Sequence, residues 1–337
     1  MRVAFCGSGG FAGPSLRAIV EAGHSVSAVI TQPARPSGRG GKLTATPLAQ
    51  VAREPNLNIS NIFEFENVND PACVQAIGST TPDVIVVVDF GQFIRVAARA
   101  TAPLGAFNLH GSLLPELRGA APVNWAIIRG HRQTGVTTFN LVDKMDAGAI
   151  YLQAATDINP DETTDQLRLR LADIGAKLVC QTIDLLASGK GLGQAQDESK
   201  VTLAPQLTRA DGLIDWSAPA REIRNRIHGV WPWPAGHTVF LRKDGTAMPV
   251  LIARCKVAAA DGGGSSQSAP LHQGHEDAAS SQAGTLDKDL TVICGPDGCD
   301  KLAIVEIQPA GKRLMAWRDF CNGYRAAAGD KFIRPPG

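Results

Sequence analysis

A run of five consecutive apolar residues, Val84 to Val88, constrains the fold of this chain more than any other feature. Such uninterrupted runs are typical of strands that are covered on both faces of a parallel sheet, because a strand with one wet face alternates apolar and polar residues. Further strand-like segments at 2–6, 25–31 and 105–110 are separated by stretches with helical patterns. This alternation predicts a doubly wound α/β fold with a parallel sheet and with residues 84–90 at its centre.

The sequence changes character near residue 205. Apolar residues recur mostly every three or four positions between 161 and 190, which predicts one long amphipathic helix. Beyond it, short β-like segments are separated by turns, so we predict a Rossmann-like domain over 1–205 and a small β-barrel domain over 206–337. Residues 261–283 contain one large aliphatic side chain, Leu271, and are expected to form a flexible insertion without a core.

The charge and composition of the chain do not identify a binding partner. The chain has 33 Lys+Arg against 32 Asp+Glu and a formal net charge of +1, which indicates neither a nucleic acid nor a membrane surface. The N-terminus lacks the layout of a signal peptide, and no apolar stretch approaches the roughly 20 residues that cross a bilayer. Seven scattered cysteines, an odd number, disfavour a disulfide framework. We therefore expect a cytoplasmic protein.

Glycines at positions 7, 9, 10 and 13 follow the first strand and are similar to a dinucleotide-binding turn. That mechanism needs an acidic residue near the end of the second strand to hold a ribose, but the sequence there is Ile-Thr-Gln-Pro-Ala over residues 30–34. A nicotinamide-dependent dehydrogenase is therefore a distant alternative. A tight strand-to-helix turn beside a ligand cleft is the favoured interpretation.

Asn108 and His110 are the first candidates for catalysis. Two positions apart on a predicted strand, they project from the same face, at the strand end where doubly wound sheets bind ligands. An amide donor and an imidazole at this place suit the stabilisation of an oxyanion, although a polar pair that merely satisfies the strand end remains an alternative. Asp146 is the better of two nearby carboxylates, because Gly148 lets its loop approach a ligand closely, and Asp143 is interpreted as a solvated charge.

These residues resemble the methionyl-tRNA formyltransferase family. Asn108, His110 and Asp146 match its catalytic Asn, His and Asp. Ser-Leu-Leu-Pro at 112–115 and Arg-Gly-Ala-Ala-Pro at 118–122 match its folate-site signature, and the basic stretch at 31–40 matches its tRNA-contacting loop. The similarity continues through Ile-Asp-Trp at 214–216 and Trp-Pro-Trp-Pro at 231–234 to Gln-Pro-Ala-Gly-Lys at 308–312, and thus covers nearly the whole chain.

The resemblance implies transfer of a formyl group from 10-formyltetrahydrofolate, as co-substrate, to the α-amino group of methionyl initiator tRNA, without a metal. Asn108 and a protonated His110 are then expected to stabilise the tetrahedral oxyanion, and Asp146 to help move the proton off the attacking amine. The protein is expected to be a monomer and its second domain an OB-like barrel that aids tRNA binding.

The same resemblance implies two binding sites. The residues expected to bind the folate are Ser112, Leu113, Leu114, Pro115, Phe90 and Gly91. Asp89-Phe90-Gly91 stands where an Ala-Tyr-Gly-like triplet is more usual, so the contacts of this pocket are expected to differ in detail. Arg35, Arg39 and Lys42 make the stretch from Thr31 to Lys42 locally basic and are expected to bind tRNA.

Two other functions compete with this interpretation. A folate-dependent formyltransferase that acts on a nucleotide sugar or on glycinamide ribonucleotide would share the catalytic set, and the basic loop and the second domain argue against it. The other competing function is that of an RNA-binding protein without catalytic activity, and the intact Asn/His/Asp set argues against it.

Overall fold

The computed structural model describes residues 1–37, 41–258 and 282–335. It divides into two compact units, the first formed by residues 1–123, 133–157 and 166–206, and the second by residues 124–132, 158–165 and 207–337. Arg39 and most of the predicted insertion at 261–283 lie outside the described residues. In the described part of the chain, no helix is long and apolar enough to cross a membrane.

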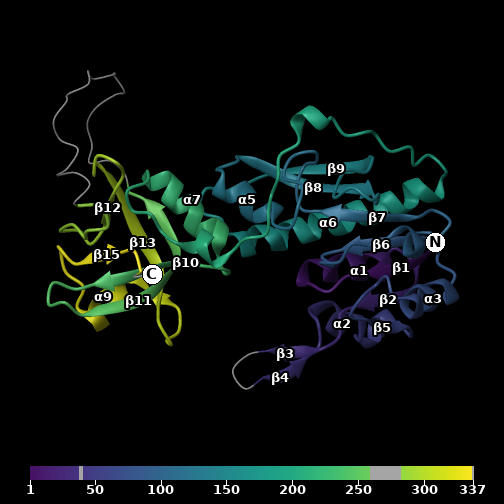
Figure 1. Cartoon of the computed structure of the whole chain (residues 1–337), viewed down its shortest axis with the longest axis horizontal. Coiled ribbons are helices and arrows are strands. Elements are labelled where there is room, and N and C mark those ends of the chain that lie inside the picture. The colour runs from purple at the N-terminus through teal and green to yellow at the C-terminus, as the bar shows by residue number, and fades with distance from the viewer. Residues whose placement is uncertain (38–40, 259–281, 336–337) are drawn as a thin grey trace. The chain divides into compact units, whose positions relative to one another are not determined.

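The first unit contains a seven-stranded sheet with the order β5-β2-β1-β6-β7-β8-β9. Its strands are β1 (Arg2–Cys6), β2 (Ser25–Thr31), β5 (Ile62–Glu64), β6 (Val84–Val88), β7 (Ala106–His110), β8 (Gln133–Asn140) and β9 (Ile150–Asp157). The pairs from β5 to β7 are parallel, whereas β8 and β9 extend the sheet in antiparallel fashion (Figure 1). The predicted doubly wound α/β fold is confirmed, and the strand at 84–88 is the central strand of the sheet.

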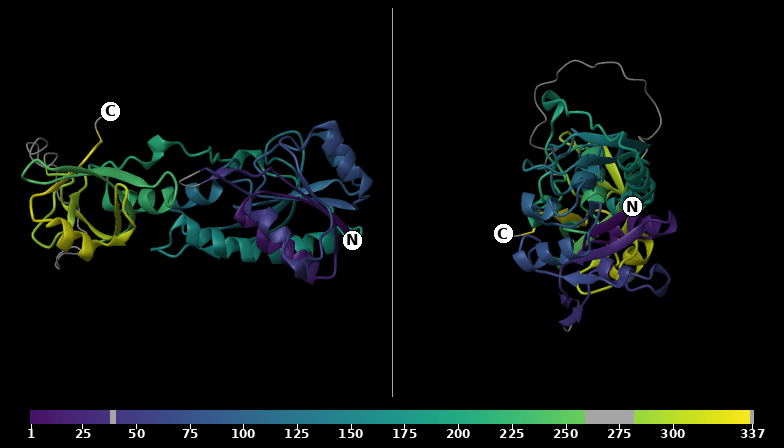
Figure 2. Two further views of the ribbon diagram at one scale, coloured as in Figure 1. Left: turned by 90° about the horizontal axis from the view of Figure 1, so that it is seen from below. Right: turned by 90° about the vertical axis from the view of Figure 1, so that its right-hand side faces the viewer.

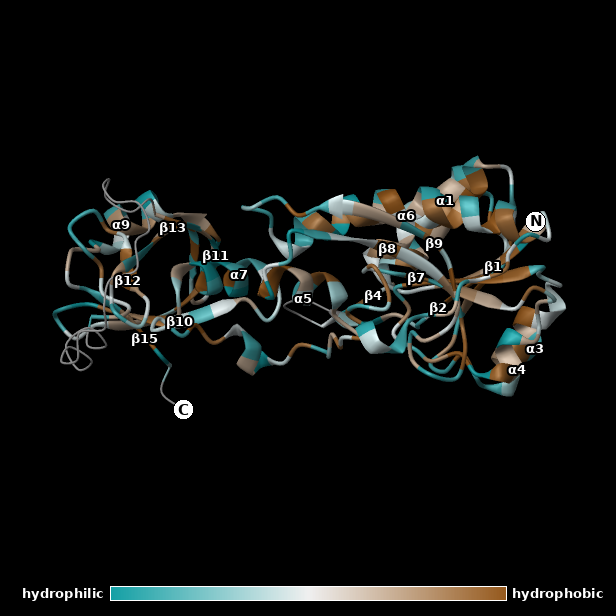
Figure 3. Ribbon diagram, turned by 90° about the horizontal axis from the view of Figure 1, so that it is seen from above, coloured by the Kyte–Doolittle hydropathy of each residue, from teal (hydrophilic) through white to brown (hydrophobic). Residues whose placement is uncertain are grey.

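Helices cover both faces of this sheet. Figure 3 shows α1 (Gly13–Glu21) and α6 (Thr164–Ala187) on one face, and α3 (Pro71–Ser79) and α4 (Val96–Arg99) on the other. Cys73 and Ile77 of α3 share a buried cluster with Ile85 and Val87 of β6. A Cβ at Gly175 of α6 would lie 2.5 Å from the side chain of Leu109, so this glycine allows α6 to pack closely on β7. Packing on both faces explains why every residue of β6 is apolar.

Shorter elements complete the first unit. The helix α2 (Pro47–Ala52) packs on α1. The helix α5 (Pro122–Ile128) follows the segment after β7, but from residue 124 onward it belongs to the second unit. Two short strands, β3 (Arg35–Ser37) and β4 (Lys42–Thr44), pair antiparallel in a hairpin that projects from the unit (Figures 1 and 2). The basic stretch predicted as a loop is therefore a hairpin in its described part.

The second unit is a small antiparallel β structure with the strand order β12-β13-β11-β10-β15. Its elements are α7 (Ala220–Val230), β10 (Gly236–Leu241), β11 (Ala247–Val257), β12 (Val292–Cys294), β13 (Asp300–Pro309), β14 (Met315–Ala316), α9 (Trp317–Tyr324) and β15 (Lys331–Ile333). Bridges from Thr285 to Lys331 and from Leu286 to Val292 connect the two edge strands, so the sheet curls toward closure. This agrees with the predicted small barrel.

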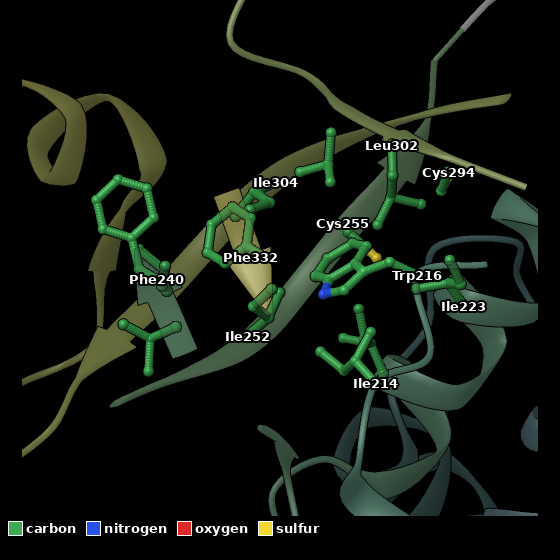
Figure 4. Close-up of a cluster of buried hydrophobic side chains, with 14 of the residues drawn as sticks. Ile214, Trp216, Ile223, Phe240, Ile252, Cys255, Cys294, Leu302, Ile304 and Phe332 are labelled. Atoms are coloured by element: carbon green, nitrogen blue, oxygen red, sulfur yellow. The ribbon is translucent and has the colours of Figure 1, made fainter. Parts of the chain in front are cut away.

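Aromatic and branched side chains fill this second unit (Figure 4). Phe240 contacts Phe320 edge-on and also lies 5.3 Å, between ring centroids, from Phe332. Trp216 is buried against Phe332, and its indole nitrogen donates to Thr238 Oγ1 at 3.3 Å. The buried tryptophan therefore has a hydrogen-bond partner for its polar atom.

His228 of α7 is buried in the same unit and makes its stability depend on pH. Its Nε2 accepts a hydrogen bond from the backbone nitrogen of Cys255 at 3.2 Å. Burial, followed by the charge of Arg224, lowers the pKa of His228 from 6.5 to about 4. The unfolded chain therefore takes up this proton at a higher pH than the folded chain does, and the stabilising contribution is complete above pH 6.5 and is lost as the pH falls toward 4.

A His228→Gln variant is expected to lose this pH dependence. Glutamine keeps an acceptor for the Cys255 amide and does not titrate, whereas the wild-type imidazole is expected to cost on the order of 2 kcal/mol of stability between about pH 7 and about pH 5. Urea unfolding of the full chain, followed by tryptophan fluorescence at about pH 7 and about pH 5, measures this difference. An equal loss of stability in the variant and the wild type would contradict the assignment.

Candidate active site

A cavity of about 370 Å³ lies in the first unit, where β6 and β7 end. Its wall is formed by the glycine turn after β1, the segment after β6, the end of β7 and the loop before β9. Residues on this wall include Phe11, Phe90, Phe93, Asn108, His110 and Asp146. The cavity therefore occupies the carboxyl edge of the sheet, where ligands of doubly wound folds bind.

The strand β7 holds Asn108 and His110 on this wall. Asn108 pairs with Val87 of β6 on one side and with Phe139 of β8 on the other, so the backbone of β7 is fixed from both sides. Both residues line the cavity, and their spacing of two along a strand places their side chains on the same face of β7. The amide and the imidazole thus face one common space.

The ring of His110 has a different partner at each nitrogen. Nε2 lies 2.9 Å from the carbonyl oxygen of Leu117, and because a carbonyl only accepts, Nε2 is the donor in this contact. Nδ1 lies 3.8 Å from Asp146 Oδ2, and both side chains are largely buried. With Nε2 donating to the Leu117 carbonyl, Nδ1 is the ring nitrogen that faces the carboxylate.

The carboxylate of Asp146 is held in a defined position. Its Oδ2 accepts a hydrogen bond from the backbone nitrogen of Gly119 at 2.8 Å. The backbone of Asp146 is left-handed, with φ of 48°. A carboxylate so placed can serve as a charge partner of the imidazole and as a proton acceptor within reach of the cavity. Asp143, in contrast, is exposed and pairs with Arg99 at 2.7 Å.

Residues predicted to bind folate fall into two groups. Phe90 and Gly91 line the cavity. The other four, Ser112 to Pro115, are not among the lining residues; Ser112 is fully buried and donates to the Glu116 carbonyl, and Gln153 donates to the Leu114 carbonyl. This segment therefore supports the backbone that follows His110 instead of forming the cavity wall.

Asp89 is engaged by its neighbours. Its carbonyl accepts hydrogen bonds from the backbone nitrogens of Ser8 and Gly9, and its carboxylate accepts from the Phe11 nitrogen and from Arg168 at 3.0 Å. A Cβ at Gly9 would lie 1.9 Å from that carboxylate. The glycine turn thus packs on the end of β6, which gives a structural reason for Gly9 without a nucleotide.

The hairpin carries two of the three residues predicted to bind tRNA. Arg35 and Lys42 are exposed, and neither lines the cavity. The sequence shows no acid between residues 31 and 42, but Glu66 pairs with Arg35 at 3.0 Å. The basic character of the hairpin is therefore partly neutralised by a residue that lies outside it.

Two cavity residues had no sequence signal. Arg168 lies on α6, 79 positions from its partner Asp89, and no local motif marks it. Phe93 follows β6 among other apolar residues and is half exposed on the wall. Phe11 differs from these two, because its position directly after the glycine turn could have indicated the cleft.

Comparisons with known proteins agree with this architecture. Residues 1–183 match the formyl transferase family, and residues 206–325 match the formyl transferase C-terminal domain. A sugar 3N-formyl transferase, WlaRD, shares the fold with a TM-score of 0.61 at 15% identity, covering 93% of this chain and 99% of that chain. HypX from Aquifex aeolicus gives a TM-score of 0.63 at 14% identity, over all of this chain and 51% of that one. The fold and the two matched domains define a formyltransferase.

Curated relatives show which family of formyltransferases this chain resembles over its full length. The methionyl-tRNA formyltransferase of Solibacter usitatus is 37% identical over 331 residues, which cover 98% of each chain. That of Koribacter versatilis is 38% identical over 335 residues and 99% of each chain. The chain belongs to the methionyl-tRNA formyltransferase family.

Proposed function

We propose that the protein transfers the formyl group of 10-formyltetrahydrofolate to the α-amino group of methionyl initiator tRNA in the cytoplasm. The observation that carries the proposal is the cavity shared by Asn108, His110 and Asp146, in a chain so similar over its full length to methionyl-tRNA formyltransferases. The proposal includes a monomeric enzyme without a metal, with a catalytic domain over 1–205 and a tRNA-binding domain over 206–337.

The geometry supports a direct transfer. The methionyl amine attacks the formyl carbon, a C–N bond forms, and the carbonyl oxygen becomes an oxyanion that Asn108 and the protonated His110 stabilise. Asp146, 3.8 Å from Nδ1 of His110, helps to take up the proton that the amine releases. When the intermediate collapses, the bond from the formyl carbon to folate N10 breaks and N10 gains a proton. The products are the formylated amine and tetrahydrofolate.

One assay tests the acceptor. Purified protein is incubated with 10-formyltetrahydrofolate and, in separate reactions, initiator Met-tRNA, elongator Met-tRNA, an amino-sugar nucleotide or glycinamide ribonucleotide. We expect formylation of the initiator species. Transfer to the sugar nucleotide or to glycinamide ribonucleotide, with none to initiator Met-tRNA, would overturn the proposed acceptor and leave a formyltransferase of another substrate class.

Replacing Lys42 is expected to weaken tRNA binding and to leave folate binding unchanged. Lys42 is exposed on β4. Each lysine that contacts a phosphate contributes about one unit to the slope of the logarithm of the binding constant against the logarithm of the salt concentration. Lys42→Ala should therefore raise the Michaelis constant for tRNA, lower its salt dependence by about one unit, and leave the Michaelis constant for folate unchanged. Lys177→Ala, at an exposed position of α6, is the control. Equal changes in the two Michaelis constants would contradict a role in tRNA binding.

A further inference from the structure

A polar segment from Gln194 to Ala204 connects the two loops that surround the predicted catalytic groups. At one end, Gln194 exchanges two backbone hydrogen bonds of 2.8 Å with Ile150, just after the loop that carries Asp146. At the other end, Ala204 donates to the Arg118 carbonyl at 2.7 Å, in the segment that follows His110. This segment therefore contacts both loops and is positioned to fix the distance between them.

Gln196 lies within this segment and uses both ends of its amide. Nε2 donates to the carbonyl oxygens of Asp146 and Gly148, at 2.7 and 2.8 Å. Oε1 accepts from Nε and Nη2 of Arg118, at 3.0 and 2.7 Å. Two acceptors on one side and two donors on the other match an amide in one orientation only, and a carboxylate could not make the same set.

Arg118 is a rigid anchor for this amide. Its side chain is 4% exposed and also reaches Glu198 Oε1 at 2.8 Å. Hydrogen bonds from Arg118 and from Lys144 lower the pKa of Glu198 to about 2, so this carboxylate stays charged at neutral pH. A planar guanidinium held at several points presents a fixed set of donors to Gln196.

Two residues beside this network, Leu117 and Asp146, have unusual backbone conformations. Asp146 has φ of 48°, and Leu117, whose carbonyl contacts Nε2 of His110, has φ of 59°. Non-glycine residues rarely adopt this left-handed region, and they persist there only where the surrounding structure holds them. Gln196 bonds to the carbonyl of Asp146, and its partner Arg118 directly follows Leu117.

We propose that Gln196 is a positioning residue for formyl transfer, which holds the backbone of Asp146 so that the carboxylate stays beside Nδ1 of His110. The proposal rests on the proposed function. Gln196 itself does not touch the reacting atoms: it acts through Asp146, and its anchor is Arg118. Loss of its two N–H donors should let Asp146 drift, and a misplacement of about 1 Å at such a site costs up to about 100-fold in rate.

The test compares Gln196→Glu with Gln196→Met in the full chain. Glutamate keeps an acceptor for Arg118 but sets an oxygen against the two carbonyls, whereas methionine keeps the volume and removes every hydrogen bond. We expect both variants to lower kcat by about 10- to 100-fold, with smaller changes in the Michaelis constants for folate and tRNA. Gln75→Glu, with the same charge change at an exposed side chain of α3, should retain wild-type turnover.

A double-mutant cycle with Asp146→Asn separates positioning from general stability. If Gln196 acts through Asp146, adding Gln196→Glu to Asp146→Asn lowers kcat no further. Additive losses, wild-type turnover in both Gln196 variants, or losses that only follow the folded fraction measured by circular dichroism would overturn the positioning role. A wild-type protein that transfers no formyl group would overturn the proposed function and this inference together, whereas the other outcomes leave the proposed function intact.

Discussion

Turnover of the Asn108→Ala variant is expected to fall by about 10²- to 10³-fold, the usual cost of removing one donor from an oxyanion site. The side chain lies on the cavity wall, and its strand is fixed between β6 and β8, so its amide is placed in advance of the reaction. Such a donor acts on charge that develops only in the transition state. The Michaelis constant for folate should therefore change much less than kcat.

Rapid-quench measurement of a single turnover gives the rate of the transfer step directly. The control is Asn61→Ala, which removes an exposed hydrogen bond to the Ser27 carbonyl at 2.9 Å and should leave this rate unchanged. A near-normal rate for Asn108→Ala, or a loss that appears only in the Michaelis constant, would contradict the oxyanion role.

The parts of the fold that could be predicted are those that apolar side chains build. The run at 84–88 identified the central strand because both of its faces are buried by hydrocarbon. The strand β8 was missed although six of its eight residues are buried, since three of these are threonines, and the hydroxyls of Thr137 and Thr138 form hydrogen bonds inside the protein. Threonine at 137, for example, donates to the Ser112 carbonyl at 2.7 Å. Sequence periodicity does not register burial of this kind.

Within the site, local spacing predicted which residues face the cavity, and long-range contacts were beyond it. Asn108 and His110 share a face because a strand has a period of two. The contact between Gln196 and the Asp146 carbonyl joins positions 50 apart in the chain, and the pairing of Asp89 with Arg168 spans 79. Such contacts arise from tertiary packing, so neither of them leaves a pattern in any window of sequence.

The loop that carries Asp146 depends on a glycine for a reason that the sequence did not reveal. Gly148 was expected to allow close approach to a ligand, but its close neighbour is the protein backbone. A Cβ at this position would lie 1.7 Å from the carbonyl oxygen of Asn140, whose own nitrogen donates to the Ala149 carbonyl at 2.9 Å. Any larger residue must therefore push the loop away from the end of β8.

Gly148→Ala is accordingly expected to displace Asp146 and to weaken the fold. We expect the free energy of unfolding to fall by about 1–3 kcal/mol, as for other overpacked sites. Turnover should fall by about 10²-fold, because the loop that shifts also carries the carboxylate beside His110. Urea unfolding and steady-state kinetics on the same preparation measure the two effects.

The matched control is Gly10→Ala, because a Cβ at Gly10 meets no atom within 4 Å and the residue lies in the same unit. This variant should keep both its stability and its turnover, which separates the clash at Gly148 from any general intolerance of alanine for glycine. A Gly148→Ala protein with normal turnover would show that Asp146 keeps its position when the loop moves. In that case the 3.8 Å spacing between His110 and Asp146 would be maintained by contacts other than the close approach of Gly148 to Asn140.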